Sequence, residues 1–134
     1  MTIHVSTQGR NAQLDALLAQ CESGRVQLWS GTQPTNANAP GPADGGALAT
    51  LQLNGPAFAE AASGTADLIV DPPISGTADA DGVITWARVV SMYGDVVMDG
   101  SVGTGSGSDF VMNSTYVTEG QVLNLLGGSI SLPA

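Results

Sequence analysis

The spacing of apolar residues changes along this chain, from a helical period near the start to a strand period afterwards. Residues 9–22 carry an apolar stripe at positions three and four apart, which predicts an amphipathic helix. The stripe consists of Leu14, Leu17, Leu18 and Cys21. Thr7 or Asn11 is expected to cap its start, and Ser23-Gly24 to end it. From residue 25 onward apolar and polar residues alternate, which predicts strands.

The strongest strand signal runs from Gly82 to Val102. Two runs rich in β-branched residues flank Tyr93-Gly94-Asp95, and this arrangement is typical of a β-hairpin. The first run, residues 83–92, is apolar at odd and at even positions, which predicts a central strand covered on both faces. Within it, Trp86 is expected to pack in the core. Arg88 shares its face and is expected to stack on it or to pair with an acidic residue.

Further short strands are separated by turns rich in glycine and proline. The predicted strands are 25–30, 48–53, 66–70, 83–92, 96–102, 109–118 and 121–132, the last with a break at Gly127-Gly128. Residues 103–108 are expected to form a hairpin loop. The pattern predicts a mainly β fold, a β-sandwich or jelly roll of about 6–8 antiparallel strands with one N-terminal α-helix. We expect residues 1–134 to form a single β domain, with an N-terminal segment and helix over 1–24.

A long loop over residues 31–46, GTQPTNANAPGPADGG, interrupts the strand pattern. It consists of small and polar residues with almost no apolar anchor. A loop of this length without secondary structure is unusual in a compact domain and often serves a function. We expect it to be mobile or to become ordered by contact with a partner.

The charge of the chain narrows the classes of partner. Three arginines oppose 12 acidic residues and there is no lysine, so the formal net charge is −9. Such a surface repels nucleic-acid phosphates and is disfavoured at an anionic membrane. No apolar run approaches the ~20 residues of a membrane-spanning helix, and the first residues lack the order of a signal peptide. We therefore expect a protein made in the cytoplasm that binds neither nucleic acid nor membrane.

Residues suited to catalysis are scarce. His4 is the only histidine and Cys21 the only cysteine, and no serine lies in a nucleophile elbow. Cys21 continues the helical stripe and is predicted to be buried. Residues 79–82, DADG, resemble part of a calcium loop, but without further acidic ligands a plain turn is the preferred interpretation; calcium shared with Asp95 or Asp99 is the alternative. The prediction is a protein that is not an enzyme and has no catalytic residues, cofactor or metal.

Several short motifs follow one another along the chain. They are an opening "ST-x-x-RNA-x-LDAL", then "(V/L)-x-(L/I)-(W/Y)-(S/T)-G-x-Q-P", "PAFA-x-AASG", "TW-x-R", "DG-x-VG" and a closing "NST-x-(I/V)-x-x-GQ-V". In this layout, which covers nearly its whole length, the chain resembles a family of small β-rich virion structural proteins of tailed bacteriophages. The corresponding segments here are Ser6–Leu17, Val26–Pro34, Pro56–Gly64, Thr85–Arg88, Asp99–Gly103 and Asn113–Val122. The resemblance carries no catalytic motif and implies a component of an assembled particle.

This resemblance leads to a functional expectation. The leading hypothesis is a capsid decoration (cement) protein that forms a homo-oligomer, with a trimer favoured, on the head and stabilises it by binding the major capsid protein. The residues expected to make these contacts are His4, Gln33, Pro34, Asn36 and Pro40. A tail or baseplate component that binds tail proteins is the first alternative.

A carbohydrate-binding adhesion module is the second alternative, and it would need an exposed aromatic platform. The aromatic residues considered for this platform are Trp29, Trp86, Tyr93 and Tyr116. Core packing of Trp86 is the preferred interpretation, because a large aromatic residue in a strand covered on both faces normally belongs to the core.

Overall fold

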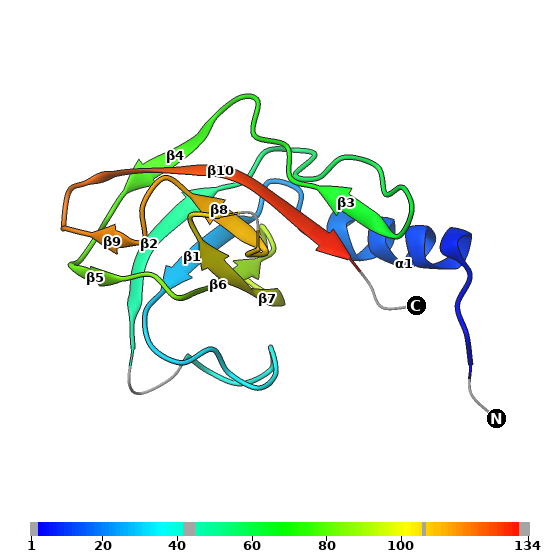
Figure 1. Ribbon diagram of the computed structural model, residues 1–134, viewed down its shortest axis with the longest axis horizontal. Coiled ribbons are helices and arrows are strands. Elements are labelled where there is room, and N and C mark those ends of the chain that lie inside the picture. Colours follow the sequence, from blue (N-terminus) through cyan, green and yellow to red (C-terminus); the bar gives the residue numbers. More distant parts are fainter. Residues whose placement is uncertain (1–2, 42–44, 106, 132–134) are drawn as a thin grey trace.

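The protein is seen here as a computed structural model that describes residues 3–41, 45–105 and 107–131 (Figure 1). Within these ranges the chain forms one helix followed by 10 strands. The elements are α1 (Thr7–Ala19), β1 (Arg25–Trp29), β2 (Ala47–Gln52), β3 (Thr65–Asp67), β4 (Ile74–Thr77), β5 (Gly82–Val83), β6 (Trp86–Val90), β7 (Val96–Gly103), β8 (Phe110–Met112), β9 (Tyr116–Val117) and β10 (Val122–Ser131). The predicted mainly β fold with one N-terminal helix is confirmed.

Helix α1 begins at Thr7, so its cap lies before both residues that the sequence offered as caps. Ser6 is the N-cap, and its Oγ accepts a hydrogen bond of 3.0 Å from the Gly9 amide, so the expectation of Thr7 or Asn11 is wrong. The helix ends at Ala19 rather than at residue 22. The apolar stripe is nevertheless directed inward, because Leu14, Leu18 and Cys21 are all buried. Ser23 then adopts a left-handed conformation, with φ 54°, and the chain turns into β1.

The main sheet has 8 strands in the order β2-β1-β6-β7-β8-β10-β3, and β4 also pairs with β10. It curls until β2 comes beside β4, where the Asp79 amide donates to the Leu48 carbonyl at 2.7 Å. Gly76 of β4 lies close against β2: a Cβ there would lie 2.5 Å from Cδ2 of Leu51 and would displace that side chain. The curled sheet encloses the main apolar core, in the manner of a β-sandwich.

The hairpin of β6 and β7 is confirmed, but the single strand over 83–92 is not. The strand is interrupted at Ile84 and Thr85. The Ile84 amide donates to the Thr115 carbonyl just before β9, and the Thr85 amide donates to the Trp29 carbonyl at the end of β1. The segment before the break, β5, pairs with β9 in a separate 2-stranded sheet. Only Trp86–Val90 is covered on both faces. The predicted strand 109–118 is divided in the same way, into β8 and β9.

Residues 103–108 do not connect a hairpin, and here the expectation of antiparallel strands throughout is wrong. Strands β7 and β8 are parallel, with Val102 opposite Phe110. Ser101 and Asp109 hold the returning chain: the Ser101 amide donates to Asp109 Oδ2 at 3.0 Å, and the Asp109 amide donates to Ser101 Oγ at 3.0 Å. These bonds bring the start of β8 back alongside the end of β7 in the same direction.

Strand β10 runs through the predicted break. Gly127 and Gly128 lie within it, at a shift of register relative to β8. Such a bulge bends a strand without ending it. Leu132, the predicted end of this strand, lies outside the described residues.

Candidate interaction site

A polar and aromatic cluster covers the outer face of β1, β6 and β7. Trp29 and Trp86 are cross-strand partners whose rings stack with centroids 5.3 Å apart. The guanidinium of Arg88 lies 5.2 Å from the centre of the Trp86 ring. Trp86 is 0% exposed, as expected, but it packs here and not in the main core inside the sheet. We call Trp29, Trp86, Arg88 and Asp99 the outer cluster.

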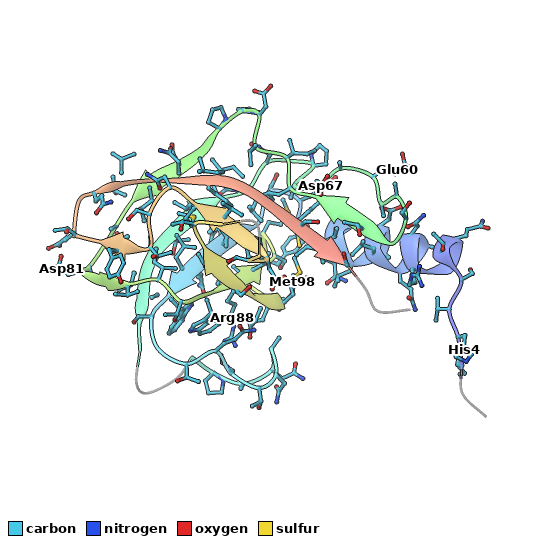
Figure 2. The ribbon with its side chains drawn as sticks, in the orientation of Figure 1. His4, Glu60, Asp67, Asp81, Arg88 and Met98 are labelled. Carbon is cyan, nitrogen blue, oxygen red and sulfur yellow. The ribbon has the colours of Figure 1, made fainter. Side chains whose placement is uncertain are left out.

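Arg88 forms an ion pair with an acidic residue, Asp99, as predicted. Its Nε donates to Asp99 Oδ1 at 2.8 Å and its Nη2 donates to Asp99 Oδ2 at 3.1 Å. The two side chains thus form a bidentate ion pair between β6 and β7 (Arg88 in Figure 2). The hydrogen bond to Asp99 raises the pKa of Arg88 above its ordinary value, while burial acts in the opposite direction. Both side chains are almost fully buried, so this pair is structural and is not presented to a ligand.

The loop that follows β1 is anchored at its base. The Ser30 amide donates to the Gly46 carbonyl at 3.0 Å, and the Gly46 amide donates to Ser30 Oγ at 3.0 Å. The hydroxyl of Thr85 donates to the Gly31 carbonyl at 2.6 Å. These bonds fix where the loop leaves the sheet and where it returns. The anchoring is therefore stronger than the composition of the loop predicts.

The loop also packs on the outer cluster. A Cβ at Gly41 would lie 2.3 Å from the ring of Trp29, so the backbone rests directly on that ring. Within the loop, the Asn38 amide donates to Asn36 Oδ1 at 2.9 Å and the Ala39 amide to the Asn36 carbonyl at 3.2 Å. This turn gives the tip a defined shape. Residues 42–44, part of the predicted loop, lie outside the described residues.

The structure places the predicted contact residues on two separate segments. Gln33, Asn36 and Pro40 are exposed and Pro34 is half-buried, all on the loop. His4 is exposed on an extended segment before α1, which projects away from the body of the protein (Figures 1 and 2). The loop and this segment are well separated in Figure 1, so the predicted residues do not form one site.

A groove at the C-terminal end of α1 was missed by the sequence analysis. It has a volume of about 320 Å³ and lies between the end of α1 and the turn joining β6 to β7. Met92 and Tyr93 line it and are 48% and 85% exposed. Apolar side chains at the tip of a hairpin turn, where polar residues are usual, were the signal available in the sequence. Glu22 and Asp95 add carboxylates to its lining.

The remaining candidates for chemistry have structural roles. Asp81 Oδ1 accepts a hydrogen bond of 2.7 Å from the Glu119 amide, and Asp99 is held by Arg88. Within residues 3–41, 45–105 and 107–131, no group of three His, Cys, Asp or Glu side chains is placed to hold a metal ion. Burial raises the pKa of the Cys21 thiol from 9.0 to about 11, which makes it a poor nucleophile at neutral pH.

No family model, curated protein or solved structure matches this chain. In the part of the chain that the structure describes, no helix is long and apolar enough to cross a membrane.

Proposed function

We propose that this protein is a structural component of a bacteriophage virion, a decoration protein that binds the major capsid protein and stabilises the head as a homotrimer. The observation that carries the proposal is the long loop after β1, which is tied at its base and presents exposed amide side chains. A protein that acts by binding a lattice needs such contacts and needs no reactive centre.

The loop is suited to bind a partner because it is shaped before contact. Its base is tied by Ser30 and Gly46, and its backbone rests on Trp29. Preorganisation of this kind lowers the entropy cost of association. The exposed amides of Gln33 and Asn36 then offer donors and acceptors to a capsid surface. The net charge of −9 suits the outer surface of a head, away from the packaged DNA.

The proposal is tested by binding to purified heads that lack the protein. The double variant Gln33→Glu/Asn36→Asp keeps the shape of both side chains and the acceptor that Asn38 uses, but adds two negative charges. We expect this variant to fold normally and to lose at least about tenfold in affinity for heads, equal to ~1.4 kcal/mol.

The matched control is Gln13→Glu/Asn113→Asp, which makes the same change of charge at exposed positions on α1 and after β8. It should bind heads like the unaltered protein. Equal binding by both variants would contradict the assignment of the loop. Immunogold labelling of virions tests the location, because labelling confined to the tail would contradict a role on the head.

A further inference from the structure

We propose that the arm before α1 of one copy binds in the groove at the C-terminal end of α1 of a neighbouring copy. The arm comprises Ile3, His4 and Val5, and the groove is the one lined by Met92, Tyr93, Glu22 and Asp95. This contact rests on the homo-oligomer proposed above and would join its copies.

The arm has an apolar side chain that its own domain leaves uncovered. Ile3 is 84% exposed, and its neighbour Val5 is only half-buried. The chain is extended at Ser6, with φ −65° and ψ 163°, so the arm leaves the helix without folding back on the body (Figure 1). A short extended segment with alternate apolar residues is a common form of peptide that docks on another protein.

The groove offers the complementary surface. Ala19, Met92 and Tyr93 supply its apolar area, and the rest of the lining is polar or acidic: Gln20, Glu22, Ser23, Ser91 and Asp95. The volume of about 320 Å³ is large enough for a branched aliphatic side chain and its neighbours. Methionine adapts its shape to a partner, and tyrosine is enriched at protein interfaces. The groove thus offers two exposed side chains, Met92 and Tyr93, against which an aliphatic side chain can pack.

Polar groups of the arm and groove are also compatible. No acidic residue occurs before Asp15, so the arm is not repelled by the carboxylates of Glu22 and Asp95. The imidazole of His4 is a hydrogen-bond donor that either carboxylate can accept from. His4 can therefore pair with one of the two groove carboxylates, and the arm itself adds no acidic group to the interface.

The arm cannot fill the groove of its own copy. The two lie at opposite ends of α1, whose 13 residues span ~20 Å at 1.5 Å per residue. Ile3 lies three residue steps before Ser6, a distance of at most ~11 Å when fully extended. An arm in the groove must therefore come from a second copy.

A contact between two different surfaces of the same protein has a consequence for symmetry. Each copy gives an arm and receives an arm, so the copies associate head to tail and close into a ring if the rotation allows it. A trimeric ring is one such closed form. An assembly built this way is broken by removing either half of the contact.

Cysteine cross-linking tests the contact directly. A chain with Ile3→Cys is mixed with a chain with Met92→Cys under mild oxidation, and the disulfide between the two chains is measured. Cys21 is fully buried and does not compete. The control replaces Met92→Cys by Tyr116→Cys, which is also exposed but lies on β9. We expect several times more cross-linked product with Met92→Cys, and equal yields would overturn the proposal.

Complementation tests the head-to-tail arrangement in solution. Ile3→Asp removes the arm contact and Tyr93→Ser removes the groove contact, and each variant alone should sediment as a monomer. Mixed together, they retain one intact contact and should form a dimer but no ring. Tyr116→Ser, the control, should assemble like the unaltered protein. Ile3 lies outside the packed domain, so the Ile3→Asp variant should remain folded when it fails to assemble. Circular dichroism verifies that it is folded.

These results are separable from head binding. Assembly lost by Ile3→Asp but retained by Tyr116→Ser supports the inference, whatever happens on heads. A chain that stays monomeric at every concentration and gives no cross-link above the control overturns it. Failure of the unaltered protein to bind heads contradicts the proposed function and leaves the contact between copies standing.

Discussion

The two faces of β6 are buried by different means. On the inner face, Ala87 and Val89 pack in the main core, opposite Leu28 and Val26 of β1. On the outer face, Trp86 and Arg88 are equally inaccessible, but they stack, pair with Asp99 and lie in the cluster that the loop after β1 contacts through Trp29. The inner face is aliphatic, whereas the outer face combines aromatic rings with a charged pair.

This difference shows that a strand covered on both faces need not lie between two sheets. The inner face of β6 is covered by the rest of the curled sheet. Its outer face is covered by the side chains of the outer cluster and by the loop after β1. The inner cover depends on shape and volume, and the outer cover depends on a bidentate ion pair and on backbone resting against a ring. The two faces should therefore respond to different substitutions.

Breaking the ion pair should produce the largest effect. Asp99→Asn leaves the buried guanidinium of Arg88 without its counter-charge, and loss of one partner of a buried pair costs about 3–5 kcal/mol. Urea denaturation measures this change. The control Asp67→Asn, on the exposed part of β3, should change stability by less than ~0.5 kcal/mol. A cost for Asp99→Asn as small as that of the control would show that the pair is solvated.

The inner face should respond to alkaline pH through Cys21, the only titratable side chain among the described members of the main core. Its thiol has a pKa of about 11 in the folded protein and 9.0 ordinarily. Below pH 9 both states keep the proton, and above it only the unfolded state loses it. Stability should therefore fall by at most ~1.4 kcal/mol per pH unit between these two values, a loss of about 2 kcal/mol by pH 11.

This pH dependence is measured as the difference between the unaltered protein and Cys21→Ala, which removes the thiol and leaves every other titrating group. The gap in free energy of unfolding between the two should narrow from pH 9 to pH 11. A constant gap would mean that the thiol ionises alike in the folded and unfolded states.

Shortening an aliphatic side chain on the inner face should have an intermediate effect. Val89→Ala removes two methyl groups from a fully buried site and should cost about 2 kcal/mol. Calorimetry measures the loss, and Val83→Ala, at a partly exposed position on β5, is the matched control. If Val89→Ala costs more than Asp99→Asn, the proposed ranking of the two faces is reversed.

The smallest effect is expected where the loop meets the outer cluster. Gly41→Ala places a methyl group against the Trp29 ring and should lift the loop, at a cost of about 1 kcal/mol. Tryptophan fluorescence should shift as the ring gains solvent. Gly105→Ala, where no atom lies within 4 Å of the added group, is the control. Unchanged fluorescence in Gly41→Ala would show that the loop is not held by this contact.

The local pattern was sufficient for much of the fold. Spacing alone located the helix, its buried stripe, the hairpin of β6 and β7, and the burial of Trp86 and Cys21. These features follow from the periods of helix and strand and from the cost of leaving apolar surface in water. The scarcity of catalytic residues, the acidic charge and the exposed loop positions were likewise visible in the chain itself.

Other features depend on contacts between distant residues. The break at Ile84 and Thr85 occurs because these residues bond to segments far away in the chain, and the parallel pairing of β8 follows from the Ser101 and Asp109 bonds. The groove likewise forms only because the end of α1 meets the turn at Tyr93. Periodicity reports which faces are buried, but not what covers them, because the covering group is chosen by packing in three dimensions.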